Sequence, residues 1–228
     1  MASSREYETF REKGIVLATP SGREYIAAHG RIAAVLEERY LDIVAAVDNE
    51  FSRNRRLHGE RIQCRPGCTD CCYQLFQITE VEAAHISTGM KSLPVRQSET
   101  LRERARVYIE ARRKLVTENG EPEAWGRLPP AGTRLACPAL VDGTCAIYDF
   151  RPLMCHKFGM PLFNPDKPDQ IFACELNFKN GEEIEDPKLI QIQTSIHRAW
   201  TELQQDYNEA GGYRDPEPLT VARAILEI

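Results

Sequence analysis

The sequence predicts a mainly α-helical fold, in which long helices bracket a cysteine-rich loop region with at most a short β-hairpin. Two observations predict this class. Apolar residues recur at spacings of three and four over several long stretches, which is the period of an amphipathic helix. Residues 120–185, in contrast, are rich in Pro and Gly and contain few helical signals. The chain length suits a single compact domain built from residues 1–61, 62–180 and 181–228.

The first half of the chain contains three predicted helical stretches. Residues 22–57 have the apolar spacing of one long helix or of two joined helices. Residues 79–82, Thr-Glu-Val-Glu, are typical of a capping box and predict a helix that runs to about Gly89. Another helix is predicted from Pro94 until the Asn-Gly pair at residues 119–120.

The second half begins with irregular chain and returns to helix near the end. Residues 140–143, Leu-Val-Asp-Gly, are typical of a tight turn between two short extended pieces. Residues 187–208 carry an apolar helical stripe, and residues 220–228 suit a short final helix that packs on the core. Every cysteine therefore lies in irregular chain between the predicted helices.

Charge and composition argue against several classes of function. A net charge of −5 argues against a broad nucleic-acid footprint. The sequence has no apolar run of the roughly 20 residues that a membrane span needs. Its first residues lack the pattern of a secretory signal, so we expect a cytoplasmic protein whose thiols stay reduced. The 8 cysteines then need a role other than disulfides, and metal binding or redox chemistry is the leading one.

Half of the cysteines lie close together in the sequence, namely Cys64, Cys68, Cys71 and Cys72. If a helix begins after Gly67, the last three share one face, because positions i, i+3 and i+4 are neighbours on a helix. The Pro66-Gly67 turn would fold the first one back toward them. The start of a helix favours anions, so we expect lowered thiol pKa values, which favour the thiolates that a metal requires.

The other cysteines are more widely spaced: Cys137, Cys145, Cys155 and Cys174. Pro138, Gly143 and Pro152 form turns that hold the chain around these sulfurs. Metal-bound thiolates accumulate negative charge, and basic residues near them in sequence would offset it. The candidates are Arg61, Arg65, Arg134, Arg151 and Lys157.

Other roles account for the cysteines less well. A lone cysteine is usually a buried apolar residue, but a dense group followed by a second group is not explained that way. A disulfide framework needs an oxidising compartment, and no export signal is visible. A thioredoxin-like exchange site at Cys68 and Cys71 lacks the βαβ pattern around it and leaves the other cysteines unexplained. All eight cysteines are therefore predicted to be metal ligands.

The combined spacing resembles a known family. Cys-x3-Cys-x2-Cys-Cys, followed by Cys-Pro-x-Leu-x2-Gly-x-Cys-x-Ile-Tyr-x2-Arg-Pro-x2-Cys, is similar to the YkgJ-type CxxCxxCC family, whose domain is described as zinc- or iron-chelating. The resemblance covers about residues 62–174 and implies metal binding. The chain departs from the family in its first gap of three residues and in His156, where the family often has Arg. We predict that His156 is not a ligand, because the cysteines alone suffice.

The metal and the function stay open at this level. An iron–sulfur cluster is favoured over zinc, because structural zinc sites usually pair two compact knuckles and only one cysteine group here is compact. Eight thiolates suffice for two four-thiolate sites or for one cluster with thiolates to spare. The chain is then a redox or cluster-delivery protein with an unknown protein or redox partner, or a zinc-stabilised interaction module. A third reading is a cluster-dependent enzyme that modifies a protein or peptide, which the similarity of flagellin lysine methylases to this family implies.

Overall fold

The fold is mainly helical, as the sequence predicts. It is described here from a computed structural model that covers residues 20–65, 67–118, 133–163, 168–211 and 219–226. Two short antiparallel sheets of two strands each accompany the helices in this part of the chain. None of the described helices is both long enough and apolar enough to cross a lipid bilayer.

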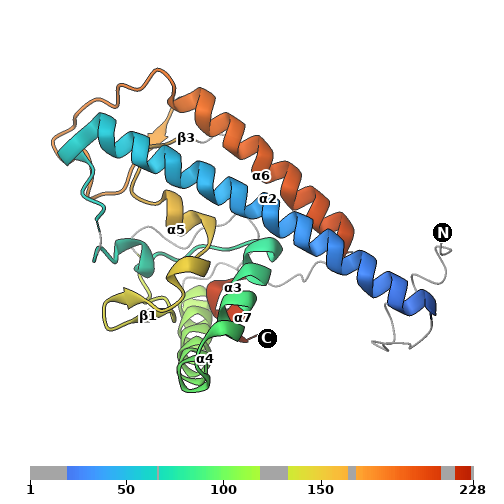
Figure 1. Cartoon of the computed structure of the whole chain (residues 1–228). Coiled ribbons are helices and arrows are strands. Elements are labelled where there is room, and N and C mark those ends of the chain that lie inside the picture. The colour runs from blue at the N-terminus through green and yellow to red at the C-terminus, as the bar shows by residue number, and fades with distance from the viewer. Residues whose placement is uncertain (1–19, 66, 119–132, 164–167, 212–218, 227–228) are drawn as a thin grey trace.

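A pair of long helices forms one layer of the molecule. Helix α2 (Pro20–His58) is a single continuous helix, and α6 (Leu189–Gly211) lies along it (Figure 1). Leu203 of α6 and Leu153 of the short helix α5 (Leu153–Lys157) are buried against α2. The α2 residues in this core recur at helical spacing, which is why the amphipathic pattern predicted the helix: Leu36, Tyr40, Ile43 and Val47.

The second layer consists of α3 (Glu80–Ser92), α4 (Val95–Glu118) and α7 (Val221–Leu226). Their apolar faces form a second core, to which Ala139 and Ile147 of the loop region also belong. The loop region therefore packs on this layer, while α5 packs on the α2–α6 layer. Cys137 and Cys145 pack against the second core, and Cys155 lies on α5.

The predicted capping box is present and has a second use. The backbone N–H and the hydroxyl of Thr79 both donate to Oε2 of Glu82, at 2.7 and 2.9 Å. The other carboxylate oxygen of Glu82 accepts the backbone N–H of Leu153 at 2.8 Å. Glu82 is buried, and burial raises the pKa of its carboxyl. One side chain thus starts α3 and also anchors the start of α5.

The predicted tight turn is a two-residue hairpin. Strand β1 (Leu140–Val141) pairs with β2 (Thr144–Cys145), with Leu140 opposite Cys145. The two turn residues, Asp142 and Gly143, have φ values of 48° and 75°. Positive φ at both positions is the geometry that favours Asp-Gly in such turns.

A second hairpin was not predicted, because strands of two residues carry no readable alternation. Strand β3 (Leu162–Phe163) pairs with β4 (Ile171–Phe172). Gln193 of α6 supports this hairpin by accepting the backbone N–H of Phe163 and donating to the carbonyl of Pro161, both at 2.8 Å.

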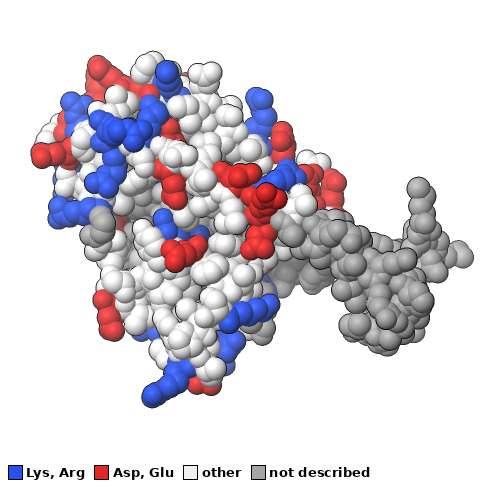
Figure 2. Space-filling model, viewed as in Figure 1, with Lys and Arg blue, Asp and Glu red and all other residues white. Residues whose placement is uncertain are grey.

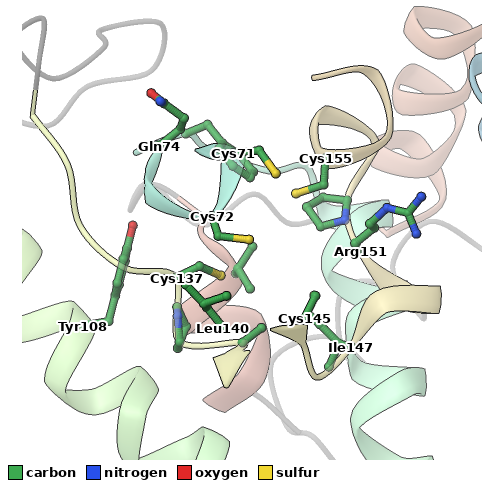
Figure 3. Close-up of a pocket in the computed structure, with 15 residues that line it drawn as sticks. Cys71, Cys72, Gln74, Tyr108, Cys137, Leu140, Cys145, Ile147, Arg151 and Cys155 are labelled. Carbon is green, nitrogen blue, oxygen red and sulfur yellow. The ribbon is translucent and has the colours of Figure 1, made fainter. Parts of the chain in front are cut away.

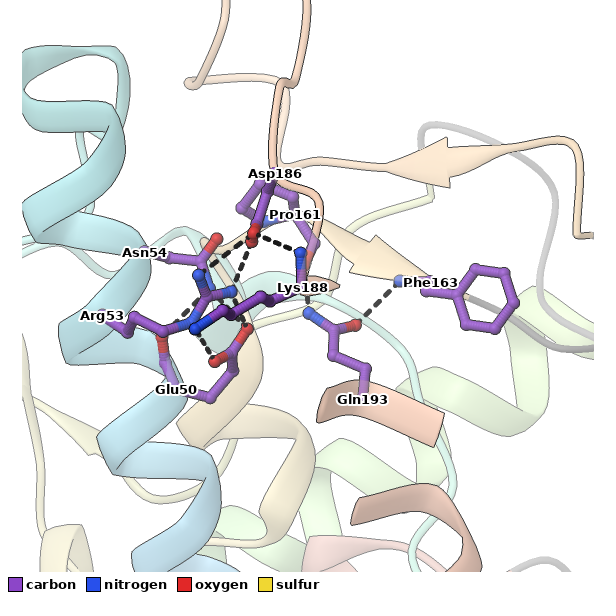
Figure 4. Close-up of polar contacts among 8 residues, drawn as sticks. All are labelled: Glu50, Arg53, Asn54, Pro161, Phe163, Asp186, Lys188 and Gln193. Carbon is purple, nitrogen blue, oxygen red and sulfur yellow. Dashed lines mark hydrogen bonds and ion pairs between the residues drawn. The ribbon is translucent and has the colours of Figure 1, made fainter. Parts of the chain in front are cut away.

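A polar cluster ties the chain before α6 to α2 (Figure 4). Nε of Arg53 donates to Glu50 one turn earlier at 2.7 Å, and its Nη1 donates to Oδ1 of Asp186 at 3.1 Å. The same Oδ1 accepts the backbone N–H of Lys188 at 3.0 Å, next to the start of α6. Side chains of Glu50 and Asp186 are each 1% exposed, so this charge network is shielded from solvent.

Candidate metal centre

Cysteines from both sequence groups line one small, mostly apolar cavity of about 30 Å³: Cys71, Cys72, Cys137, Cys145 and Cys155. Figure 3 shows the sulfur atoms of Cys71 and Cys155 pointing toward one another. The fold therefore brings the compact group to face part of the loop-held group.

The compact group does not start an α-helix, so that expectation is wrong. Asp70–Tyr73 form a short 3₁₀ helix, η2, and Cys68 lies before it. The N–H of Cys72 bonds to the carbonyl of Thr69, three residues back, at 2.9 Å. The turn ends at Gln74, whose backbone is extended. Pro66, which was expected to shape the preceding turn, lies outside the described residues.

The chain on either side of the cavity is joined by backbone and charge contacts. The N–H of Cys137 donates to the carbonyl of Cys72 at 2.7 Å, and the N–H of Leu135 donates to the carbonyl of Tyr73 at 3.1 Å. Arg134 adds a 2.7 Å ion pair with Asp70, and its guanidinium carbon lies 5.3 Å from the centre of the Tyr73 ring. These contacts hold the two cysteine groups together across more than 60 positions of sequence, and no local sequence signal reveals them.

Helix α5 places Cys155 against the cavity, and His156 faces the other way. Nδ1 of His156 lies 2.8 Å from Oδ1 of Asp48 on α2. Burial lowers the pKa of this histidine, and the hydrogen bond with Asp48 opposes that shift. The structure gives His156 a positioning contact between α5 and α2. Its predicted absence from the ligand set stays a prediction.

The pKa of Cys71 in the compact group is raised by its hydrogen bond with Cys72 and by burial, whereas the sequence predicted lowered thiol pKa values for this group. Burial raises the pKa of Cys137 to about 12, and it also raises the pKa of Cys145 and of Cys155. The expected lowering relied on a helix start that is not formed. For the loop-held cysteines the dominant effect is removal of the thiolate from water. A thiolate in this cavity therefore needs a positive partner, which a metal ion or cluster supplies.

The other three cysteines lie outside this cavity, in a second neighbourhood: Cys64, Cys68 and Cys174. The pKa of Cys64 is raised to about 11 by burial and by the nearby Cys68, Cys71 and Cys174 thiols. Sγ of Cys174 lies 3.7 Å from Oδ2 of Asp70.

Of the predicted basic residues, Arg151 lies at the cavity wall. Its positive charge lowers the pKa of Cys145, although the raising effect of burial is larger. Lys157 is on α5, and burial lowers the pKa of its amine. Arg134 is occupied by Asp70. Of the predicted basic residues, Arg151 is therefore in the best position to offset the negative charge of metal-bound thiolates in the cavity.

Within the described residues, no group of three or more Cys, His, Asp or Glu side chains is already arranged to hold a metal ion. The donor chemistry nevertheless fits, because soft thiolates are the preferred ligands of zinc and of iron–sulfur clusters. Turning a cysteine from one staggered rotamer to another moves its sulfur by roughly 3 Å. Cysteines that already line one cavity can therefore reach a common metal by side-chain rotation.

A helical scaffold that gathers free cysteines at the junction of its layers defines a class of cysteine-cluster metal-binding proteins. The comparison with known families identifies the chain within that class. The model of the CxxCxxCC family, described as a "putative zinc- or iron-chelating domain", matches residues 63–181, and the chain belongs to this family. No curated protein and no solved structure matches the chain.

Raised thiol pKa values predict how the metal-free protein responds to pH. An unfolded thiol ionises near its ordinary pKa of 9.0, whereas that of folded Cys137 is about 12. The unfolded state therefore loses its proton first, and stability present below pH 9 is lost as the pH rises toward 12. We expect the free energy of unfolding of the reduced, metal-free chain to fall over this range in urea titrations followed by circular dichroism.

The matched control for this titration is Cys137→Ala. Other groups also ionise in alkali, so the difference between the two chains isolates this thiol. The variant should lose less stability between pH 9 and the highest pH reached. Equal losses in both chains would show that Cys137 does not ionise differently in the folded and unfolded states.

Proposed function

We propose that the chain binds an iron–sulfur cluster through the cavity cysteines and uses it in a redox or cluster-dependent role with a protein partner. The observation that carries this proposal is that five thiols from three segments line one apolar cavity. A structural zinc ion and a common iron–sulfur cluster each take four protein ligands, so the five thiols supply a complete set for either.

The adjacent Cys71 and Cys72 support a cluster in particular. Successive side chains on a 3₁₀ helix point about 120° apart, because this helix has three residues per turn. Both residues nevertheless line the same cavity. A cluster presents several separated iron corners, and two diverging thiolates reach different corners more easily than they reach one ion.

The residues around the cavity have definable tasks toward such a cluster. The cysteine thiolates would hold it, and Arg151 would offset part of their negative charge. The apolar wall would keep water away from the sulfurs, and solvent exposure is one of the factors that set the reduction potential of a cluster. When bound, a cluster supplies one-electron redox chemistry.

The size of the cavity favours a second candidate, a zinc-stabilised module. A volume of about 30 Å³ accepts a single ion, whereas a four-iron cluster requires the cysteines to turn outward. A zinc-bound form would join the two helical layers through the loop region. Chelation would then unfold the protein, as it does in other small zinc domains.

Anaerobic purification followed by iron, sulfide and zinc analysis distinguishes the two candidates. The proposal predicts a coloured protein with iron and acid-labile sulfide in similar amounts and with visible charge-transfer absorption. A colourless protein with stoichiometric zinc, unchanged after anaerobic reconstitution with iron and sulfide, would establish the zinc module instead. A protein that binds neither metal would contradict both.

A further inference from the structure

Cys64 and Cys68 open onto the outside of the molecule. Cys64 lines a cleft of about 470 Å³ with Arg55 and Arg65, and Cys68 lines a neighbouring cleft of about 350 Å³ with Arg65 and Lys179. Figure 2 shows basic side chains gathered at the upper left, where the C-terminal end of α2 lies in Figure 1. These thiols differ from the cavity set in being within reach of a dissolved ion.

One buried side chain holds this outer neighbourhood together. Asn177 is 5% exposed and bonds to two separate segments. Its Oδ1 accepts the backbone N–H of Gln63 at 2.8 Å, and its Nδ2 donates to the carbonyl of Gly159. Its own N–H donates to the carbonyl of Cys174 at 2.8 Å. The segments that carry Cys64 and Cys174 are thus fixed relative to each other by a satisfied polar network.

Gly159 allows the close approach of Cys64. A Cβ at Gly159 would lie 2.7 Å from the Cβ of Cys64, and the φ of Gly159 is +103°. Glycine meets both demands, because it has no side chain and tolerates positive φ. Sγ of Cys64 then lies 3.9 Å from the carbonyl oxygen of Phe158. This packing restricts where the Cys64 thiol can go.

The carboxylate of Asp70 is a fourth donor, beside Cys174. Oδ2 of Asp70 lies 3.7 Å from Sγ of Cys174, and its Oδ1 accepts a hydrogen bond from Arg134 at 2.7 Å. The arginine orients the carboxylate and leaves one oxygen on the cysteine side. Three thiolates and one carboxylate oxygen are an acceptable tetrahedral set for zinc.

We propose that Cys64, Cys68, Cys174 and Asp70 form a second metal site, separate from the cavity, that takes a single divalent cation of the zinc type. The inference rests on the proposed function only in that the cysteine region binds metal. The outer site exchanges its ion with solvent, whereas the cavity retains its metal. The eight cysteines then divide into five at the cavity and three at the outer site.

Cobalt(II) titration of the anaerobic chain tests this division, because tetrahedral cobalt–thiolate centres absorb visibly. The probe is added to a chain with Cys137→Ser, Cys145→Ser and Cys155→Ser, which leaves only two cavity thiols, and to that chain combined with Cys174→Ser. We expect the cavity variant to keep a tetrahedral cobalt spectrum and the combined variant to lose it. Asp70→Asn in the cavity variant should raise the cobalt dissociation constant at least about tenfold, since changes outside the ligand set already cost that much.

The outcomes separate this inference from the proposed function. Loss of all cobalt binding in the cavity variant, with binding by the unaltered chain, would overturn the second site and leave metal binding by the cavity intact. Retention of the spectrum after Cys174→Ser would also overturn it. An unaltered chain that binds no cobalt, iron or zinc would contradict the proposed function as well. Circular dichroism of each variant shows whether its helices remain.

Discussion

Replacing Cys155 by Ser should remove the metal from the cavity while the helices remain. Cys155 is the cavity cysteine on α5, and burial raises its thiol pKa well above the ordinary value. Changes outside the ligand set typically cost about 10- to 100-fold in metal affinity, so loss of a ligand should exceed about 100-fold. Metal analysis of the purified variant, with its far-ultraviolet circular dichroism, measures both parts of this prediction.

Two further variants control this experiment. Cys155→Ala lacks the buried hydroxyl that serine introduces, and it should lose the metal as completely. Cys174→Ser lies outside the cavity and should keep the cavity metal. Full metal content in Cys155→Ser and Cys155→Ala would mean that Cys155 is not a ligand.

Gly89→Ala should destabilise the chain by about 2 kcal/mol or more, as overpacking a closed interior does. Elsewhere in a helix this change is stabilising by roughly 0.5–1 kcal/mol. Gly89 lies inside α3, where an added Cβ would be 2.3 Å from Cγ of Phe150. The expected change in the free energy of unfolding is therefore opposite in sign to the change that helix propensity alone would give. Urea unfolding of the two chains measures the difference.

The second variant in this test is Phe150→Leu. A smaller side chain at this position should relieve the overlap, so Gly89→Ala should cost less in the Phe150→Leu background. A cost that is the same in both backgrounds would show that the ring does not cause it. If Gly89→Ala stabilised the chain, the close packing of α3 on residue 150 would be contradicted.

The helices were predictable because their signals are local. The capping box at Thr79 and Glu82 and the Asp142-Gly143 turn specify their own geometry within four residues. The long stripe of α2 needs only periodicity. The start predicted at Gly67 was wrong because the same residues are also compatible with a 3₁₀ turn, and pairing with the chain at residues 135–137 decides between the two.

The sequence predicted that the cysteines act together, but it did not predict which of them line the cavity and which lie outside it. Spacing alone does not show that Cys174 lies beside Asp70, or that Asn177 joins three segments, because these contacts form between residues far apart in sequence. The thiol pKa values of the compact group were mispredicted because the expected helix start is not formed, and the pKa of Cys71 is raised by its hydrogen bond with Cys72 and by burial. The burial that raises the pKa of Cys137 and of Cys155 depends on how the two layers pack.

The central claim is that the gathered cysteines are the ligands of the bound metal. Identifying the atoms nearest to the metal tests this claim most directly. X-ray absorption spectroscopy of the anaerobically purified chain measures them at the iron edge and, where zinc is present, at the zinc edge. We predict a shell dominated by sulfur, with additional iron–iron scattering if the metal is a cluster. A shell made only of nitrogen and oxygen would contradict the account.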